Sequence, residues 1–473
     1  MIKEYPIFLA GQWKSCRKAK EIKNPYNEEG VGIVHQAGEE EVEAAIRAAQ
    51  RGFQELRRLP LYRRAEALQR ITDGIKERRE EFARMICSEA GKPITDARVE
   101  VGRAVLNFQT AAEEAKRLIG EVIPMDLAPG SESRFGIIRR FPIGPLLGIT
   151  PFNFPLNLVG HKIAPAIASG NSIVIKPAPQ TPITALLLAE VISKSGLPDE
   201  AVGVLPCGND LAEKMVLDER FKLLSFTGSA RVGWALKGKA GKKRVLLELG
   251  GNAGVIVHED TDLEYAARRC AAGGFSYAGQ SCISVQRIFV QDNALKPFLD
   301  RFVTMVKGLK LGDPMDEGTN VGPMIDSGAA ERTEQWVIEA VKQGAKVLVG
   351  GKRRSRMFEP TVLTDVTRVM KVCSEEVFAP LVVVIPYREF DEALSAMNDS
   401  AYGLQAGLFT NDLKKVFQAY EELEVGGLMV NEVPTYRIDP MPYGGVKDSG
   451  LGREGVRYAI EEMTELKLLA IKP

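Results

Sequence analysis

The alternation of short apolar runs with helical segments restricts the fold of this chain more than any other feature. From about residue 146 the runs LLGIT, SIVIK, VGVLP, KLLSFTG and RVLLEL follow one another, separated by helical stretches. This order predicts βα units of a parallel sheet with helices on both faces. A second unit with the same alternation starts near residue 250 and includes GVIVHE, RIFVQ, LVVVIPY, LQAGLF and GLMVN. We therefore expect an α/β protein.

Three regions outside these units lack this alternation. Residues 39–118 are rich in Ala, Glu, Arg and Leu with helical periodicity, which predicts amphipathic helices whose charges face solvent. Residues 119–142 lose that period and are typical of an extended arm or hairpin. The tail TELKLLAIKP is strand-like, and its edge would stay open unless it pairs with another element or another subunit.

Size and composition argue against several classes of protein. A length of 473 residues suggests about two or three domains. The 62 basic and 62 acidic residues balance, so nothing indicates a nucleic-acid partner, and no apolar stretch predicts a signal peptide or a membrane span. Six scattered cysteines without a CxxC pair are typical of a reduced, cytoplasmic protein. Because the three histidines share no ligand spacing, we expect no metal centre.

Polar or glycine-rich segments follow four predicted strands. They are PFNFP at 151–155, KPAPQTP at 176–182, FTGS at 226–229 and ELGG at 248–251. Ligands of open parallel sheets bind outside the carboxyl ends of the strands. Each segment alone is typical of an ordinary turn, but the four together predict a binding site.

One cysteine differs from the others in its setting. Cys282 lies in YAGQSCISVQ, among small and polar residues, between a helix-like run and a strand-like run. A thiol on such a glycine-containing connection can face a cleft and act as a nucleophile. Taken alone, a loop cysteine that only packs is the more common situation.

Seven motifs in order make the chain resemble the NAD(P)-dependent aldehyde dehydrogenases over almost its full length. They are PFNFP, IKPAPQTP, FTGS, LELGG, GQSC, EEVFAP and PYGGVKDSGLGRE. The resemblance implies a Rossmann-like cofactor domain (1–118 and 143–247), an α/β catalytic domain (248–440) and a small β oligomerisation arm (119–142 and 455–473). The stretches GQSCISVQR and YRIDPMPYGGVKDSG resemble the lactaldehyde and succinate semialdehyde branches. The arm and the tail favour a homodimer or homotetramer.

The chemistry of aldehyde oxidation suggests roles for four residues. Cys282 would attack the carbonyl carbon and form a thioester that is easily hydrolysed. The side chain of Asn153 and the backbone N–H of Cys282 would stabilise the oxyanion. Glu248 would activate water, with a pKa raised by its apolar surroundings, and Lys162 stands where the family has a lysine sometimes placed in a proton relay. The simpler alternatives are an Asx turn at Asn153, a solvent-exposed Glu248 and a helix-surface Lys162.

The resemblance also suggests how the chain would bind its cofactor, NAD or NADP. Lys176 would contact the adenosine ribose, and Gly228 and Ser229 would place a helix N-terminus at the pyrophosphate. Glu376 would bind the nicotinamide ribose, beside Phe378. The other residues expected around the cofactor are Thr150, Pro151, Phe152, Pro179, Gly208, Val232 and Leu249. Pro179 replaces a glutamate that often holds both ribose hydroxyls, so a 2′-phosphate would meet no carboxylate there, and we expect NADP to be accepted.

The choice of substrate depends on fewer residues. The resemblance places Arg437, in the segment PTYRID, near the mouth of the aldehyde tunnel, and Ser281 and Ile283 beside the nucleophile. A guanidinium there would favour a small polar or anionic aldehyde, such as lactaldehyde or succinate semialdehyde. Arg437 could equally pair with Asp439 or with another subunit.

Three other functions are open on the sequence. A CoA-acylating semialdehyde dehydrogenase would transfer the acyl group to CoA and would not need Glu248 as a base. A binding or structural protein on this scaffold predicts the loss of Cys282, Asn153 or Glu248, and all three are present. A thiol hydrolase would need a histidine beside its nucleophile, and no motif of this chain contains one.

Overall fold

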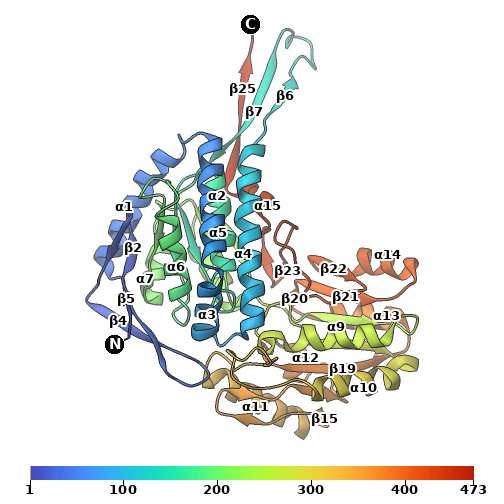
Figure 1. Ribbon diagram of the computed structural model, residues 1–473. Coiled ribbons are helices and arrows are strands. Elements are labelled where there is room, and N and C mark those ends of the chain that lie inside the picture. Colours follow the sequence, from blue (N-terminus) through green and yellow to red (C-terminus); the bar gives the residue numbers. More distant parts are fainter. Residues whose placement is uncertain (1) are drawn as a thin grey trace.

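The computed structural model describes residues 2–473, which form two sheets covered by helices and an arm that projects from the body (Figure 1). The first sheet has the strand order β24-β12-β11-β8-β9-β10-β2-β3. Its five inner strands are parallel, as predicted, whereas β2 and β24 pair with them in antiparallel fashion at the two ends. The strands are β2 (Ile7–Leu9), β3 (Gln12–Lys14), β8 (Leu146–Ile149), β9 (Ile173–Lys176), β10 (Val202–Val204), β11 (Leu223–Thr227), β12 (Arg244–Glu248) and β24 (Gly450–Leu451).

Helices pack on both faces of the first sheet and form two apolar cores. In one core, the helices from α2 through α6, together with α15, pack on one face of the sheet. In the other core, α1, α7 and α8 pack on the opposite face. The predicted helical region 39–118 is confirmed as four helices. The helices are α1 (Glu39–Leu56), α2 (Leu61–Glu77), α3 (Arg79–Ala90), α4 (Ile94–Glu114), α5 (Asn157–Ser169), α6 (Ile183–Ile192), α7 (Asn209–Leu217), α8 (Ala230–Lys239) and α15 (Val456–Glu462).

The second sheet has the order β15-β18-β19-β14-β13-β21-β22, and only β15 runs antiparallel to its neighbour. Its strands are β13 (Gly254–Val257), β14 (Arg287–Gln291), β15 (Lys346–Val349), β18 (Thr361–Thr364), β19 (Leu381–Tyr387), β21 (Gln405–Phe409) and β22 (Gly427–Val430). The helices of this part are α9 (Leu263–Phe275), α10 (Asp292–Lys307), α11 (Ser327–Lys342), α12 (Lys371–Ser374), α13 (Phe390–Asn398) and α14 (Leu413–Glu422). The predicted α/β class is therefore confirmed, with mixed sheets.

Smaller elements complete the fold. A three-stranded sheet near the N-terminus has the order β1-β5-β4, and two short pairs, β16-β17 and β20-β23, lie in later loops. Their bounds are β1 (Glu4–Tyr5), β4 (Lys18–Lys23), β5 (Gly30–Gln36), β16 (Arg353–Arg354), β17 (Met357–Phe358), β20 (Tyr402–Gly403) and β23 (Val446–Lys447). The sequence patterns did not indicate these short strands.

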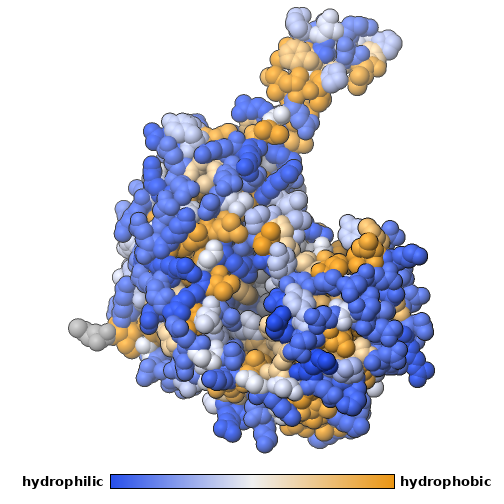
Figure 2. Space-filling model, turned by 45° about the vertical axis from the view of Figure 1, so that its right-hand side comes forward, coloured by the Kyte–Doolittle hydropathy of each residue, from blue (hydrophilic) through white to orange (hydrophobic). Residues whose placement is uncertain are grey.

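The arm consists of β6 (Glu121–Pro124), β7 (Phe135–Pro142) and β25 (Thr464–Ile471). All eight residues of β25 pair with β7, so the strand-like tail finds its partner within the chain. Helix α15, which the predicted arm range 455–473 includes, packs instead with α4 and α5 in the core of the body. Apolar side chains gather on the arm in Figure 2, and the exposed ones are Ile119, Val122, Leu127, Leu466, Leu468 and Leu469.

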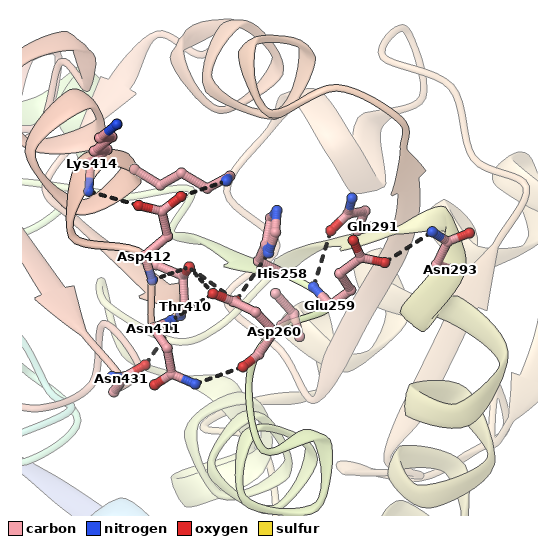
Figure 3. A network of polar contacts seen from close by, with 12 residues as sticks. His258, Glu259, Asp260, Gln291, Asn293, Thr410, Asn411, Asp412, Lys414 and Asn431 are labelled. Atoms are coloured by element: carbon pink, nitrogen blue, oxygen red, sulfur yellow. Dashed lines mark hydrogen bonds and ion pairs between the residues drawn. The ribbon is translucent and has the colours of Figure 1, made fainter.

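The carboxyl ends of β13, β21 and β22 are joined by a polar network (Figure 3). The carboxylate of Asp260 accepts hydrogen bonds from the Thr410 hydroxyl and the Asn411 N–H, each at 3.0 Å, and contacts His258 Nδ1 at 3.0 Å. Asn431 accepts from the Thr410 N–H at 3.2 Å. These bonds connect the ends of three strands, so the polar groups at this edge of the second sheet bond to one another.

The described part of the chain contains neither a membrane-spanning helix nor a cluster of metal ligands. Among residues 2–473, no helix combines the length and the apolar character that crossing a bilayer requires. The same residues contain no group of three or more His, Cys, Asp or Glu side chains placed to hold a metal ion.

Candidate active site

A cavity of about 420 Å³ lies between the two sheets. The first sheet faces it with its carboxyl ends, because Glu248 is the last residue of β12 and Thr227 the last of β11. The second sheet faces it with the amino ends of its strands, because Cys282 precedes β14 and Glu376 precedes β19. The rule that ligands bind beyond carboxyl ends therefore describes only one wall of this cavity.

Most of the predicted site residues line this cavity. They are Pro151, Phe152, Asn153, Gly228, Ser229, Glu248, Leu249, Ser281, Cys282, Ile283, Glu376, Phe378 and Arg437. The predicted residues outside its lining are Thr150, Lys162, Lys176, Pro179, Gly208 and Val232. Strands far apart in sequence thus bring the quoted motifs to one place.

The backbone before Cys282 takes an unusual path. Tyr277, Ala278 and Gly279 have φ values of 47°, 53° and 66°, in the left-handed region. A Cβ on Gly279 would lie 2.1 Å from the carbonyl oxygen of Ala379, so only glycine fits this turn. The turn follows the end of α9 and places Cys282 in the lining of the cavity.

The thiol of Cys282 is partly buried and faces one hydroxyl group. Its Sγ lies 3.1 Å from the hydroxyl oxygen of Tyr443. Burial raises the pKa of Cys282 to about 12, and the hydrogen bond with Tyr443 opposes part of that rise. At neutral pH the resting group is therefore a thiol, which must lose its proton to become a strong nucleophile.

Asn153 reaches across the cavity to the loop that carries the cysteine. Its Nδ2 donates a hydrogen bond to the carbonyl oxygen of Gln280 at 3.0 Å, and its buried Oδ1 has no partner among residues 2–473. The bond spans 127 residues of sequence, so the side chain does not form the local Asx turn that was the alternative. An amide nitrogen has two N–H groups, and the second remains for a ligand.

Glu248 is buried, which removes the alternative of a solvent-exposed position. Its Oε2 has no hydrogen-bond partner in the described chain. Burial raises the pKa of Glu248 well above its usual range, and the negative charge of Glu454 adds to the rise, while Arg437 and Lys162 oppose it. A carboxylate with a raised pKa is a stronger base than an ordinary carboxylate.

A buried group of charges lies behind Glu248. Lys162 is fully buried on α5 instead of on a helix surface, and its Nζ donates to the hydroxyls of Ser225 at 2.9 Å and Thr227 at 2.8 Å. Glu454 lies 3.6 Å from Lys162 and 3.0 Å from Arg437. Burial would raise the pKa of Glu454, but these cations and His161 outweigh it and lower the pKa to about 2.

Arg437 does not pair with Asp439, contrary to one of the sequence alternatives. Its guanidinium bonds Glu454 and lies over the ring of Tyr443, 3.5 Å from the centroid. Asp439 is bound by Arg103, with Nη2 at 2.9 Å and Nε at 3.2 Å, and by His161 at 2.8 Å. Arg437 is therefore a buried member of the cavity wall.

Arg103, on α4, is a cavity residue that sequence analysis missed. The region 39–118 was expected to carry solvated charges, but Arg103 lines the cavity and its side chain is only 21% exposed. No hydrogen bond from its Nη1 is found within residues 2–473, so this group can bind a ligand. No motif surrounds Arg103, whereas Tyr443 and Glu454 lie within the quoted stretch PYGGVKDSGLGRE.

Several features at the other side of the cavity fit a dinucleotide. Ser229 is the N-cap residue of α8, and its side chain forms no cap hydrogen bond. The first N–H groups of a helix have no intrahelical partner and favour a phosphate. Thr150 Oγ1 is buried without a partner in the part of the chain described. Glu376 accepts a hydrogen bond from the Gly251 N–H at 2.9 Å, and a Cβ on Gly250 would lie 2.5 Å from its other oxygen.

The remaining cofactor candidates lie around these groups. Phe152 and Phe378 meet edge to face with ring centroids 6.0 Å apart. Lys176 ends β9, and its Nζ donates to Asn209 Oδ1 at 3.1 Å. Gly208 precedes α7, and Val232 is an exposed residue of the first turn of α8. These positions outline a path from the cavity along the ends of β9 and β10.

A family model for the aldehyde dehydrogenase family matches residues 13–469. The chain belongs to the aldehyde dehydrogenase family. Its likeness to a 3-sulfolactaldehyde dehydrogenase of Priestia aryabhattai is 46% identity over 471 residues, covering 99% of this chain and 98% of that one. The predicted family is thus confirmed, and with it an enzyme that oxidises aldehydes with NAD(P).

Solved structures agree with this aldehyde dehydrogenase fold. Aldehyde dehydrogenase 21 of Physcomitrella patens, in complex with the reaction product succinate, superimposes with a TM-score of 0.98 at 45% identity over 100% of this chain and 98% of that chain. The glyceraldehyde-3-phosphate dehydrogenase GapN of Methanocaldococcus jannaschii, complexed with NADP, gives a TM-score of 0.93 at 41% identity over 97% and 100%. The branch predicted for this aldehyde dehydrogenase is consistent with these relatives.

Proposed function

We propose that this aldehyde dehydrogenase oxidises a small aldehyde that carries an anionic group, such as 3-sulfolactaldehyde or succinate semialdehyde. The observation that carries the proposal is the presence of two guanidinium groups, Arg103 and Arg437, in the wall of the cavity that contains Cys282. Planar guanidinium groups bind carboxylate, sulfonate and phosphate oxygens well. The names of the relatives, which concern small aldehydes with acidic or hydroxyl groups, support the same class.

Cys282 is proposed as the nucleophile of the first step. Its sulfur attacks the carbonyl carbon and forms a thiohemiacetal, and its proton leaves to a base in the cavity. The free N–H of Asn153 Nδ2 and the backbone N–H of Cys282 stabilise the oxyanion. A nicotinamide held beside Glu376 and Phe378 would supply the acceptor for the hydride that leaves this carbon, and loss of the hydride would leave a thioester on Cys282.

Glu248 is proposed as the base of the second step. With its raised pKa it takes a proton from a water molecule that attacks the thioester, and the carboxylic acid and the free thiol result. Besides burial, which has the largest effect, the charges of Glu454 and Lys162 behind it shift the pKa of Glu248 in opposite directions. This role favours hydrolysis over transfer to CoA, and free acid formed in the absence of CoA, identified by NMR, would support it; a product that appears only with CoA would overturn it.

The cofactor residues are proposed as follows. The N-terminus of α8, with Gly228 and Ser229, holds the pyrophosphate, and Glu376 holds the nicotinamide ribose with Phe378 beside it. Lys176 binds the adenosine ribose, and the others named around it line the path: Thr150, Pro151, Phe152, Pro179, Gly208, Val232 and Leu249. Because Pro179 places no carboxylate at the ribose, we infer that NADP is accepted, alongside NAD.

The test of the substrate class compares two aldehydes and two arginines. For Arg103→Gln we expect KM for succinate semialdehyde to rise about tenfold or more, because a charge-assisted contact is lost, with little change for neutral propanal. Arg98→Gln is the matched control, since Arg98 lies on the same helix and pairs with Glu80 outside the cavity. Equal losses for both aldehydes in Arg103→Gln would make the residue structural and remove the support for an anionic substrate.

Arg437 is the less suitable residue for such a test. It is buried against Glu454 and Tyr443, so its removal takes the nearer of two cations away from a buried carboxylate and leaves only Lys162, at 3.6 Å. A loss of activity in Arg437→Ala therefore combines two causes. Ser281 and Ile283, beside Cys282 in the cavity lining, are proposed to shape the space for the aldehyde.

The assembly, the division into domains and the location are proposals too. We infer a cofactor domain of residues 1–118 and 143–247, a catalytic domain of residues 248–440 and an arm centred on β6, β7 and β25. The exposed apolar side chains of the arm and the free outer edges of β6 and β25 favour a homodimer or homotetramer. Sedimentation velocity would test this, with a monomer as the contradicting result. The free cysteines favour a cytoplasmic protein.

A further inference from the structure

A lysine of the N-terminal region reaches the proposed adenosine end of the cofactor site. Lys20, on β4, donates a hydrogen bond from its Nζ to the carbonyl oxygen of Pro179 at 3.1 Å, across 159 residues of sequence. Lys20 lies on the same face of β4 as the buried Ile22, so its side chain turns toward the body. An ammonium has three N–H groups, and this contact uses one.

The ammonium of Lys176 lies in the same region. Pro179, which Lys20 contacts, is only three residues after Lys176. Burial lowers the pKa of Lys176, Cys207 opposes part of that change, and the positive charge of Lys20 adds to the lowering. Neither lysine forms an ion pair with an acidic residue within residues 2–473. The hydrogen-bond partners of the two ammonium groups, the Pro179 carbonyl and the Asn209 amide oxygen, carry no net charge. The nearby Asp210 is exposed to solvent on the first turn of α7.

We propose that Lys20 and Lys176 together bind the 2′-phosphate of NADP, and that Lys20 is a specificity-determining residue for that cofactor. Two unpaired ammonium groups with free N–H groups, beside a position that lacks a carboxylate, form a site for a dianionic phosphate. The inference rests on the proposed function, because it takes Lys176 as a residue of the adenosine ribose. It adds a residue from β4, outside every motif quoted for the cofactor.

The test measures binding directly and without turnover. Isothermal titration calorimetry of the full chain with 2′,5′-ADP and with 5′-AMP separates the 2′-phosphate from the rest of the adenosine. For Lys20→Gln we expect Kd for 2′,5′-ADP to rise about tenfold and Kd for 5′-AMP to stay within about twofold. Lys18→Gln is the matched control, because Lys18 lies on the same face of β4, carries the same charge and has no polar contact of its side chain in the described chain; it should leave both constants unchanged.

Other results would contradict either the role of Lys20 or the adenosine site itself. If Lys20→Gln leaves the affinity for 2′,5′-ADP unchanged, or weakens both ligands equally, Lys20 does not read the phosphate and the inference is wrong while the nucleotide site stands. If Lys18→Gln has the same effect as Lys20→Gln, the effect is one of general charge and the inference is again wrong. If the wild-type protein binds neither ligand, the proposed adenosine site itself fails, and the inference fails with it.

Discussion

The polar groups at the carboxyl ends of the two sheets differ in whether they have hydrogen-bond partners. At the ends of β8 and β12, Thr150 Oγ1, Asn153 Oδ1 and Glu248 Oε2 are buried without partners among the described residues. At the ends of β13, β21 and β22, the network around Asp260 supplies partners to the corresponding groups (Figure 3). A buried polar group without a partner costs about 1–3 kcal/mol. The first edge thus keeps polar groups free for a ligand, and the polar groups of the second edge bond to one another and hold the strands together.

The largest expected effect concerns the partly buried Cys282, compared with the buried Cys270. Cys282→Ala removes the proposed nucleophile, so kcat/KM should fall on the order of 10⁴-fold or more. Its melting temperature should stay near that of the wild type. Cys270 is buried in the apolar core on α9, so Cys270→Ala should keep kcat/KM and lose about 1 kcal/mol of unfolding free energy. Steady-state kinetics and thermal unfolding of both variants test this prediction. An active Cys282→Ala variant would show that Cys282 is not the nucleophile.

Next in size is the replacement of the proposed base. Glu248→Gln keeps the shape of the side chain but cannot take a proton, and general-base catalysis contributes about 10²- to 10⁴-fold, so kcat should fall by at least about 10²-fold. Because burial and Glu454 disfavour the charged form of Glu248, the variant should unfold at the same or a higher temperature. A wild-type kcat in Glu248→Gln would contradict the assignment.

A smaller effect is expected from pH. Glu248 has a raised pKa and Cys282 a pKa of about 12, and both act after losing a proton. Raising the pH increases the fraction of each group in its active form, so kcat/KM should rise about tenfold or more from about pH 6 to about pH 9. A pH profile at constant ionic strength tests this. A rate that falls over that range would show that a protonated group limits the reaction.

The smallest effect on activity is expected for a change at the carboxyl edge of the second sheet. Asp260→Ala removes the acceptor of three contacts at a partly exposed site, and net hydrogen-bond contributions of about 1 kcal/mol suggest a loss of about 1–2 kcal/mol in unfolding free energy. The value of kcat/KM should stay within about twofold. Urea unfolding and kinetics of the same preparation test both points, and a large loss of activity with normal stability would contradict the division between the two edges.

Much of the fold was predictable because its signal is local. Apolar runs such as LLGIT and RVLLEL became β8 and β12, and the helical period of residues 39–118 became α1 to α4. The short strands β2 and β24 escaped prediction because they pair with β10 and β12 across long stretches of chain. Pairing of that kind leaves no periodic pattern in a segment of two or three residues.

The residues of the candidate site also differ in whether a local sequence signal indicated them. Cys282, Glu248 and Asn153 stood out because glycine and polar residues follow predicted strands or break a helix at those points. The burial of Lys162 gave no such signal, because a lysine on a helix is usually solvated. Its buried ammonium is held by contacts with Ser225, Thr227 and Glu454, which are distant in sequence. Arg103 and Lys20 gave no signal, because their partners Asp439 and Pro179 are 336 and 159 residues away.

The most direct test of the account is the identity of the group that carries the acyl intermediate. In Glu248→Gln with NADP and succinate semialdehyde, hydrolysis is slowed after the thioester forms, so intact-protein mass spectrometry should show an added succinyl group. Peptide mapping should place it on Cys282, and Cys282→Ser combined with Glu248→Gln should not show it. An acyl group on another cysteine, or no acyl group while the acid is still produced, would contradict the proposed mechanism.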